Sequence, residues 1–264
     1  MGLTSQSCGK AVLNEKFNIK LSNDDEIVIA LAGNPNVGKS TVFNALTGLN
    51  QHTGNWPGKT VSNARGSYNH KDKKFILVDL PGTYSLLANS VEEQVARDFI
   101  CFGRPNATVV VTDATCLERN LNLVLQVMEL TDKVILCVNL MDEAKRKGIT
   151  VDIEKLEKEL GIPVVATTAR KGEGLDELVD TIYNIALKIQ TTSPKILKYP
   201  MEVEKEISRL SNKLEKVSQD KLNTRWISLR LIEGDTTILD SIQNFLFDSS
   251  VESIEKKGDY IYEY

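Results

Sequence analysis

The sequence lacks several features that would assign it to a particular class of protein. Its 264 residues include no apolar run that approaches the ~20 residues of a membrane-spanning helix. Its polar N-terminus has no secretory signal, and the formal net charge of −4 argues against a large nucleic-acid-binding surface. With 41% hydrophobic and 26% charged residues, it has the composition of a soluble globular protein, which we expect in the cytosol.

Cysteine is scarce, and none of the four cysteines belongs to a Cys-x-x-Cys pair. One of them, Cys137, lies in an apolar, strand-like run, and Cys101 lies close to aromatic residues. Buried free thiols in a reducing compartment are therefore favoured over disulfides or a zinc site. This expectation applies to Cys8, Cys101, Cys116 and Cys137.

In contrast, one segment has every residue that a phosphate-binding loop requires. Residues 33–40 read Gly-Asn-Pro-Asn-Val-Gly-Lys-Ser, and they stand between the apolar run 27–32 and a helical pattern over 40–46. This strand, loop and helix context argues against a glycine-rich turn that matches the motif by chance. The glycines let backbone N–H groups point at a β-phosphate, and the helix presents its positive end to the same anion.

Within this loop, we expect Lys39 to reach the β- and γ-phosphates and the Ser40 hydroxyl to hold Mg²⁺. The predicted nucleotide contacts from the loop are Gly33, Asn34, Asn36, Val37, Gly38, Lys39, Ser40 and Thr41.

The pattern of the following residues predicts the α/β class. Strand-like runs alternate with helical stretches up to about residue 190, which indicates a mainly parallel six-stranded sheet with helices on both faces. The expected strands are 27–32, 61–68, 75–79, 108–112, 134–139 and 164–168, with 61–68 in an antiparallel edge hairpin. The expected helices lie near 40–47, 90–102, 119–130, 152–160 and 174–190.

The same pattern divides the chain into three segments. Residues 1–26 are interpreted as a loosely ordered extension, residues 27–192 as the α/β domain and residues 193–264 as a small all-helical domain. Two helical stretches of the last segment lie around 226–232 and 239–246. A third is indicated by apolar residues at helical spacing, namely Val203, Ile207, Leu210, Leu214 and Val217. We expect these apolar stripes to form a core, with a partner-binding groove as the alternative.

A second motif, Val78-Asp79-Leu80-Pro81-Gly82, ends the strand expected over 75–79. The Asp79 carboxylate can hold a water of the Mg²⁺ shell, and the Gly82 N–H can meet a γ-phosphate. The next residue is Thr83, where Ras-type GTPases place a water-orienting Gln. We therefore expect slow intrinsic turnover, or charge stabilisation from elsewhere.

A third motif, Asn139-Leu140-Met141-Asp142, points to guanine. The Asp142 carboxylate can accept both the ring and the exocyclic N–H donors of guanine, a pair that adenine does not offer, and such bidentate readout discriminates by about 1–3 kcal/mol. A backbone N–H of the segment Thr168-Ala169-Arg170 can meet the guanine carbonyl oxygen. Because Met141 stands where Lys is usual, some use of ATP stays open.

The loop over residues 54–60 completes the predicted site. Its Thr60 hydroxyl can ligate Mg²⁺ while a γ-phosphate is present and release it after hydrolysis, with Thr53 as the competitor for this role. The nearby His52 is expected to be a surface residue rather than an iron ligand. The predicted Mg²⁺ ligands are Ser40, Thr60 and Asp79.

Together these motifs resemble those of one family, ferrous iron transport protein B (FeoB). The resemblance runs from about residue 27 to the end and is most specific in Gly54-Asn55-Trp56-Pro57-Gly58. It implies a GTP-binding G domain and a helical, GDI-like spacer domain ahead of a polytopic membrane permease. The other segments that carry it are the phosphate-binding loop, residues 79–86, Ser90-Val91-Glu92-Glu93, residues 139–142 and residues 225–235.

The resemblance further implies the cytoplasmic part of a Fe²⁺ transporter of the bacterial inner membrane. Its expected ligands and partners are GTP or GDP and the permease region of the same protein, which this chain does not contain. No nucleic-acid partner is expected, and a homo-oligomer is left open. The chain would be an excised cytosolic part or the product of a split gene, and the abrupt end after Tyr264 favours the first.

Activation by K⁺ is also implied by the resemblance. The Asn36 side-chain oxygen matches a K⁺ ligand of the family, and the Gly54 and Trp56 carbonyls match the positions that complete that site. A cation between the α- and γ-phosphates would neutralise developing charge as an arginine finger does. The alternative is that Asn36 only caps the loop. The residues with a predicted catalytic role are Asn36, Lys39, Thr60 and Gly82.

Two other functions compete with this interpretation. A soluble GTPase for ribosome or tRNA-modification assembly would usually bring a basic RNA-binding module, whereas the tail here has mixed charge and begins with Glu202, Glu204 and Glu206. A nucleotide-sensing module with negligible catalysis can be separated only by an assay.

Overall fold

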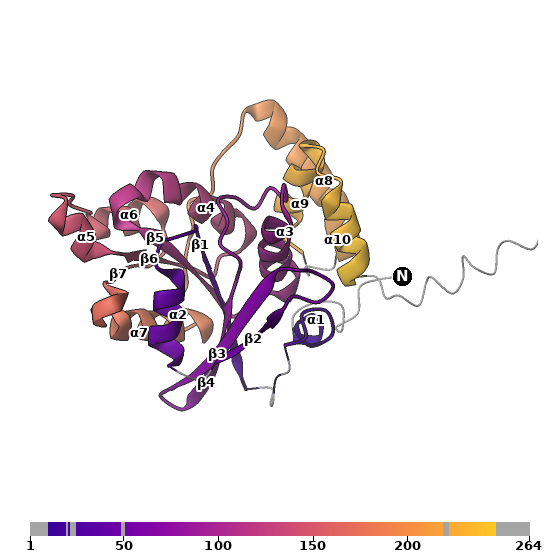
Figure 1. Cartoon of the computed structure of the whole chain (residues 1–264). Coiled ribbons are helices and arrows are strands. Elements are labelled where there is room, and N and C mark those ends of the chain that lie inside the picture. The colour runs from indigo at the N-terminus through magenta and orange to yellow at the C-terminus, as the bar shows by residue number, and fades with distance from the viewer. Residues whose placement is uncertain (1–9, 20, 22–24, 49–50, 219–221, 247–264) are drawn as a thin grey trace, which may run out of the picture. The chain divides into compact units, whose positions relative to one another are not determined.

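The computed structural model describes residues 10–19, 21, 25–48, 51–218 and 222–246 (Figure 1). Contacts within the chain divide it into two compact units. One spans residues 20–198 and is called the α/β unit here; the other combines residues 1–19 with residues 199–264 and is called the helical unit.

The α/β unit is built on one seven-stranded sheet in the order β2-β3-β4-β1-β5-β6-β7. Strands β1, β4, β5, β6 and β7 are parallel, whereas β2, β3 and β4 pair antiparallel towards one edge. The strands are β1 (Ile27–Gly33), β2 (Gln51–Asn55), β3 (Ser62–His70), β4 (Lys73–Asp79), β5 (Ala107–Asp113), β6 (Val134–Asn139) and β7 (Val164–Ala166). The predicted α/β class with a mainly parallel sheet is confirmed.

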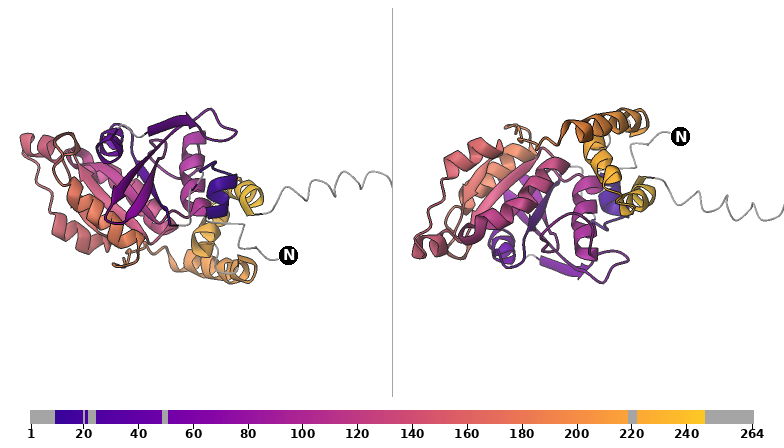
Figure 2. Two further views of the ribbon diagram at one scale, coloured as in Figure 1. Left: turned by 90° about the horizontal axis from the view of Figure 1, so that it is seen from below. Right: turned by 90° about the horizontal axis from the view of Figure 1, so that it is seen from above.

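The parallel strands are continuous apolar runs because helices cover both faces of the sheet (Figure 2). All residues of β1 are buried. Successive side chains of a strand point to opposite faces. The Ile29 and Leu31 side chains join the core that also holds Phe43 and Ile182, from helices on the same face.

The helices of the α/β unit follow the strands along the chain. Helix α3 continues directly into one π-helical turn over Phe99–Gly103, so the predicted helix 90–102 is one segment with a change in winding. The short helix α5 was not expected from the sequence. The set is α2 (Lys39–Thr47), α3 (Val91–Asp98), α4 (Leu117–Leu130), α5 (Met141–Arg146), α6 (Ile153–Leu160) and α7 (Leu175–Ala186).

The sheet has one strand more than the six that the sequence predicts. The additional strand, β2, covers residues that were interpreted as a loop and pairs with β3 from Gln51↔Gly66 to Asn55↔Ser62. As the edge strand, β2 has only β3 as a neighbour, and residues 52–55 are exposed. Burial therefore imposes no apolar alternation on β2, and its sequence carries no strand signal.

The helical unit consists of α1 (Lys10–Glu15), α8 (Met201–Ser218), α9 (Thr224–Ile232) and α10 (Thr237–Leu246). A bidentate ion pair fastens α9 to α8, because the Arg225 guanidinium donates to both Glu204 carboxylate oxygens at 2.7 and 2.8 Å. The Asn223 side chain caps α9 by accepting from the Trp226 N–H at 3.0 Å. No helix among the described residues is both long and apolar enough to cross a lipid bilayer.

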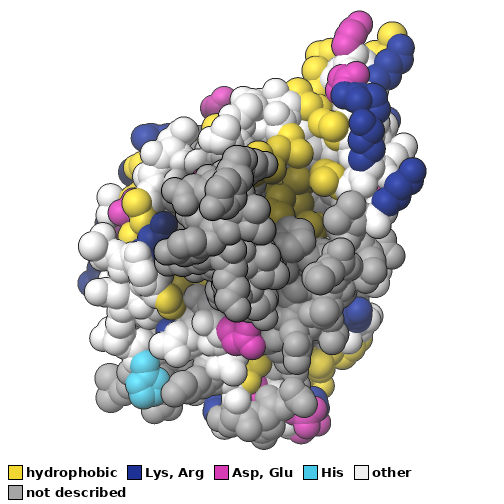
Figure 3. Space-filling model, turned by 90° about the vertical axis from the view of Figure 1, so that its right-hand side faces the viewer, with side chains coloured by type: hydrophobic (Ala, Val, Ile, Leu, Met, Phe, Trp, Pro, Cys, Tyr) yellow, Lys and Arg dark blue, Asp and Glu magenta, His cyan; other side chains and the backbone are white. Residues whose placement is uncertain are grey.

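The apolar stripe predicted on α8 is only partly buried. Ile207 is 1% exposed, whereas Val203, Leu210 and Leu214 are half-buried, and the Val217 side chain lies outside the described residues. Elsewhere in the unit, apolar side chains remain accessible. One face of the molecule shows apolar side chains beside a group of Lys and Arg (Figure 3). The exposed apolar residues of the unit include Met201, Ile232 and Leu239.

The cysteines differ in environment. Cys101 and Cys137 are buried free thiols, as expected, and burial raises the pKa of both to about 12. Cys116 is exposed, so the expectation of a buried thiol is wrong there. It stands at the surface end of a short 3₁₀ turn, Ala114–Cys116, that precedes α4. Cys8 lies outside the described residues.

Two glycines that follow β7 allow the cost of a left-handed φ to be separated from the cost of a steric clash. Gly172 and Gly174 both have a left-handed φ, of 79° and 77°, but a Cβ at Gly172 would meet no atom within 4 Å, whereas one at Gly174 would lie 2.1 Å from the Ala166 carbonyl oxygen. We expect Gly172→Ala to cost about 1–2 kcal/mol through φ alone and Gly174→Ala to cost roughly twice that through the added clash. Urea unfolding followed by Trp56 fluorescence, in a Trp226→Phe background, measures both. Equal losses would contradict the role given to Gly174.

Candidate nucleotide-binding site

The predicted site segments meet at the edge of the sheet that is formed by the carboxyl ends of its parallel strands. The parallel strands β1, β4 and β6 end at Gly33, Asp79 and Asn139, and each of these residues belongs to a predicted motif. Because the carboxyl ends of parallel strands lie at the same edge, residues far apart in the sequence become neighbours there. The segment after β7, with Thr168 and Ala169, joins them.

The phosphate-binding loop connects β1 to α2 through close backbone approaches. A Cβ at Gly33 would lie 2.6 Å from the Val111 carbonyl oxygen, and one at Gly38 would lie 2.4 Å from the Asn139 side-chain nitrogen. Gly38 and Asn36 both have left-handed φ angles, of 82° and 66°. Only glycine fits at Gly33 and Gly38 without displacing a neighbour.

Lys39 and Asp79 form an ion pair at this edge. The Lys39 ammonium also donates to the Leu80 carbonyl oxygen at 2.6 Å. Both side chains are largely buried, at 10% and 17% exposed. Burial raises the pKa of Asp79, although Lys39 acts in the opposite direction. The group expected to bind phosphates and the group expected to serve Mg²⁺ therefore lie within contact distance.

The segment after Asp79 runs along the phosphate-binding loop. The Leu80 N–H donates to the Leu31 carbonyl oxygen at 2.9 Å, and the Thr83 N–H donates to the Gly33 carbonyl oxygen at 3.3 Å. A Cβ on Gly82 would lie 3.4 Å from the Pro35 Cα. Gly82 is thus beside the loop, as its predicted role requires, while the Thr83 side chain is buried.

The Asn139 side chain connects three segments of the site. Its amide nitrogen donates to the Val37 carbonyl oxygen at 3.1 Å. Its oxygen accepts from the Thr167 hydroxyl and from the Ala169 N–H, each at 3.1 Å. Because Asn139 is 1% exposed, these bonds hold the phosphate-binding loop against the segment after β7. Its amide is thus bound within the protein itself, a role that the motif alone does not reveal.

Asp142 borders a cavity of about 780 Å³. Its carboxylate pairs with Lys171 at 3.2 Å and accepts from the Glu143 N–H at 3.0 Å. Partial desolvation raises the pKa of Asp142, but Lys171 and these hydrogen bonds outweigh it, and the pKa falls below its usual value. The cavity is also lined by the predicted residues Asn139, Thr168, Ala169 and Arg170.

Lys171 was not predicted from the sequence. With Met141 in place of the usual Lys, the cation beside Asp142 comes from the segment after β7 instead. The adjacent basic residues Arg170 and Lys171 in that segment were the available signal.

The residues predicted from the 54–60 loop lie in the β2–β3 hairpin. Gly54 is in β2 opposite Asn63. The Trp56 ring is buried and packs edge-on against Phe99, with centroids 5.5 Å apart, and its carbonyl oxygen accepts from the Lys59 N–H at 3.0 Å. Thr60 is exposed.

The turn of the β2–β3 hairpin lies at the same end of the strands as the site. Ala64 of β3 is opposite Asp79, and β3 runs antiparallel to β4. Residues before Ala64, Thr60 among them, therefore extend beyond the carboxyl end of β4. The metal-binding roles of Gly54, Trp56 and Thr60 stay predictions, as does the competing role of Thr53. His52 in β2 is exposed, as expected of a surface residue.

Asn34 and Glu93 add features that the motifs did not specify. Asn34 is 1% exposed, and its side-chain nitrogen and oxygen have no hydrogen-bond partner among the described residues. Such a group is costly by about 1–3 kcal/mol unless water or a ligand meets it. The Glu93 carboxylate accepts from the Ser85 hydroxyl at 2.7 Å and from the Asn89 N–H at 2.9 Å. These two hydrogen bonds attach the segment between β4 and α3 to the first turn of α3. The capping pattern Ser90-x-x-Glu93 was its signal.

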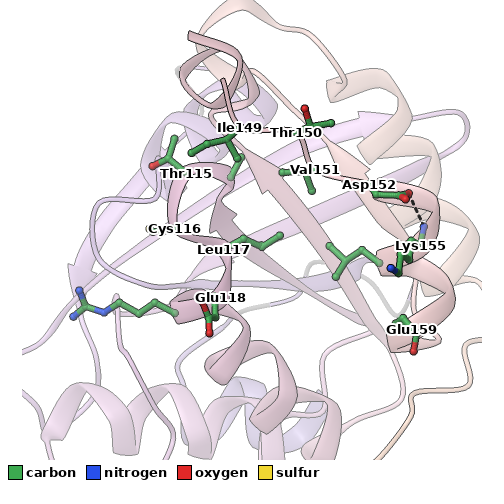
Figure 4. A pocket seen from close by; sticks show the side chains of 13 residues that line it. Thr115, Cys116, Leu117, Glu118, Ile149, Thr150, Val151, Asp152, Lys155 and Glu159 are labelled. Atoms are coloured by element: carbon green, nitrogen blue, oxygen red, sulfur yellow. Dashed lines mark hydrogen bonds between the residues drawn. The ribbon is translucent and has the colours of Figure 1, made fainter. Parts of the chain in front are cut away.

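A second cavity, of about 580 Å³, lies between residues 114–119 and residues 149–159 (Figure 4). Its lining residues include none of the predicted site residues. The stretch 149–151 lines this cavity and also a smaller one beside Asp142. The predicted nucleotide-binding residues therefore line the cavity beside Asp142 and not this one.

Comparison with known proteins decides the family. The profile for ferrous iron transport protein B matches residues 27–182, and the profile for the FeoB cytosolic helical domain matches residues 199–262. The chain belongs to the FeoB family. It is 44% identical over 238 residues to the Fe(2+) transporter FeoB of Methanocaldococcus jannaschii, a match that covers 87% of this chain and 35% of that protein. This FeoB-family chain thus spans about a third of that relative's length.

Solved structures of another FeoB share the fold. The cytosolic domain of the T. maritima FeoB iron transporter in its apo form is 40% identical, with a TM-score of 0.75 over 83% of this chain and 86% of that one. Its GDP form I is also 40% identical, with a TM-score of 0.74 over 83% and 85%. The P-loop GTPase fold of the α/β unit and the family of the helical unit are therefore shown.

Asn139→Ala tests the connecting role of this side chain. The variant leaves the Val37 carbonyl, the Thr167 hydroxyl and the Ala169 N–H without their buried partner, so we expect GDP affinity to fall at least about tenfold, which corresponds to about 1.4 kcal/mol. Calorimetric titration of GDP measures this. The exposed Asn122, whose carbonyl oxygen accepts a long hydrogen bond of 3.5 Å from Gln126, supplies the control Asn122→Ala. Equal GDP affinity in both variants would refute the assignment.

Proposed function

We propose that this chain is the GTP-binding and GTP-hydrolysing regulatory part of a prokaryotic Fe²⁺ membrane transporter. Under this proposal it works at the cytoplasmic face of the bacterial inner membrane, with the permease region of the same protein as its partner. The observation that carries the proposal is the meeting of three motif segments at one sheet edge, where Lys39 contacts Asp79 and Asn139 contacts Val37. The helical-domain match over residues 199–262 favours it over a soluble assembly GTPase.

Guanine selection is proposed for Asp142. Its lowered pKa keeps the carboxylate charged at neutral pH, and the cavity beside it is large enough for a base. A charged acceptor forms stronger hydrogen bonds than a neutral one. The Ala169 N–H already donates to Asn139, so the guanine carbonyl oxygen is left to the neighbouring N–H of Arg170.

The residues at the phosphate end fit Mg²⁺ and a triphosphate. Mg²⁺ prefers hard oxygen donors, and Asp79 offers a largely buried carboxylate beside the start of α2, where Ser40 follows Lys39. When bound, the ion would neutralise charge on the phosphates. In this proposal Lys39 moves from Asp79 to the β- and γ-phosphates, and the Thr60 hydroxyl approaches from the hairpin turn.

Hydrolysis is proposed to be slow without an added cation. The Thr83 side chain is buried, so it is poorly placed to orient an attacking water. The Gly82 N–H and Lys39 remain to stabilise charge on the γ-phosphate. Asn36 is exposed on the loop with a left-handed φ of 66°, which fits a side chain available to K⁺. The Gly54 and Trp56 carbonyl oxygens are the proposed further ligands of K⁺.

Asp142→Asn is expected to relax the preference for GTP over ATP. The change removes a charge-assisted bidentate bond, worth about 2–3 kcal/mol, so the ratio of the two dissociation constants should fall by about thirtyfold or more. Competition binding of GTP and ATP measures the ratio. The neighbouring Glu143→Gln makes the same change in charge and should leave the ratio unaltered. If the ratio in Asp142→Asn is also unaltered, base selection lies with Thr168-Ala169-Arg170.

Replacing Na⁺ by K⁺ is expected to raise GTP turnover severalfold, and Asn36→Ala should remove this gain while largely preserving GDP affinity. The ion's charge matters most as negative charge develops in the transition state, so its loss falls on the rate rather than on ground-state binding. Single-turnover phosphate release in KCl and in NaCl measures the effect. Lys39→Ala, which should abolish nucleotide binding, is the negative control. Equal wild-type rates in both salts would refute K⁺ activation and leave GTP hydrolysis itself untouched.

A further inference from the structure

The described residues at the start of the chain belong to the helical unit although they lie outside both family matches. The matches begin at residues 27 and 199. The contacts of residues 10–19 nevertheless group them with the described residues of the segment 199–264. Residues 1–26 were expected to be a loosely ordered extension, but residues 10–15 form helix α1 and several apolar side chains between residues 12 and 19 are buried.

Residues 10–19 form a compact hook. Helix α1 ends near Glu15, where the Lys16 and Phe17 N–H groups both donate to the Val12 carbonyl oxygen, at 2.9 and 3.2 Å. Asn18 then takes a left-handed φ of 53°, a conformation in which helices commonly end. The Ile19 N–H returns to the Leu13 carbonyl oxygen at 2.7 Å.

The hook buries its apolar side chains. Val12 and Leu13 are each 2% exposed, Phe17 is 4% exposed and Ile19 is 1% exposed. In contrast, Asn14 and Asn18 are exposed. One face of a ten-residue segment is therefore in a core, which a loosely ordered extension would not achieve.

The contact that identifies its partner is an aromatic stack. The Phe17 ring lies on the Phe245 ring of α10, with centroids 5.1 Å apart and an angle of 16° between the planes. Offset stacking at this separation is favourable. Helix α10 has only 10 residues, and a helix shorter than about 12–15 residues is marginal in water unless its apolar face is packed.

We propose that residues 10–19 act as an N-terminal clamp that holds α10 in the helical unit and links this unit a second time to the α/β unit. Only residues 20–26 separate the clamp from β1, the strand that carries the phosphate-binding loop. The α/β unit is therefore inserted within the helical unit, since the chain leaves the helical unit after Ile19 and re-enters it at Tyr199. The partner of the clamp is the Phe245 side of α10, recognised by apolar and aromatic contact.

Hydrogen exchange of the full chain tests the clamp. In Phe17→Ala, we expect the amides of α10 to exchange about tenfold faster or more, because the aromatic stack no longer opposes local opening of this helix. The amides of β1, β5 and β6 should keep their protection, and GDP binding should be unchanged. The matched control is Asn14→Ala in the same segment, with an exposed side chain, which should leave α10 as in the wild type. Unchanged exchange of α10 in Phe17→Ala would overturn the clamp. If the wild-type chain does not bind GDP, the proposed function is overturned instead, and the clamp is not.

A double-mutant cycle with Phe245→Ala tests whether the effect passes through the stack. If it does, the double variant exchanges at α10 no faster than the faster of the two single variants. Multiplicative effects of the two changes would show that Phe17 and Phe245 act independently, which overturns the clamp as the support of α10.

Discussion

The candidate site depends on the hydrogen bonds of one buried side chain. The Asn139 amide bonds to Val37 of the phosphate-binding loop and to Thr167 and Ala169 after β7, all at 3.1 Å. In a buried, low-dielectric setting such a network is strong when complete and costly when broken. Both ends of the site thus take their position from the last residue of β6. The close approach of this amide is also why Gly38 must lack a Cβ.

At the phosphate-binding loop, the pairing of charges adds to this close packing. Lys39 and Asp79 are both largely buried, and each offsets the cost of removing the other from water. A triphosphate with Mg²⁺ would offer each group a partner of opposite charge, so exchange of partners keeps the number of buried unpaired charges low. Asn34, whose amide is unpaired among the described residues, and the buried Thr83 lie in the two segments that run side by side here.

The helical unit illustrates a different constraint, that of short helices. Its α9 and α10 have 9 and 10 residues, so they need packing partners to persist. The ion pair of Arg225 with Glu204 supports α9 from α8. The support of α10 comes in part from the opposite end of the chain, through Phe17. A unit built from both termini encloses the α/β unit in sequence.

The sequence by itself determined the α/β class and the family, and it located the candidate site segments. These depend on patterns that are short and local: an apolar run that parallel strands require, and loop motifs placed directly after such runs. Because parallel strands end at one edge, a motif at each strand end is enough to bring Gly33, Asp79 and Asn139 together without any long-range information.

Other features were decided only by the tertiary structure. Edge strand β2 has no apolar signal because it has one neighbour and exposed residues. The pairing of Lys171 with Asp142 and the bonds of Asn139 to Val37 join residues many positions apart, and local periodicity does not encode which polar groups become partners after burial. The same holds for Phe17 and Phe245, whose contact spans almost the whole chain. The apolar residues of the N-terminal segment are too few to predict a core alone, and the ring that Phe17 stacks on lies in α10, near the other end of the described chain.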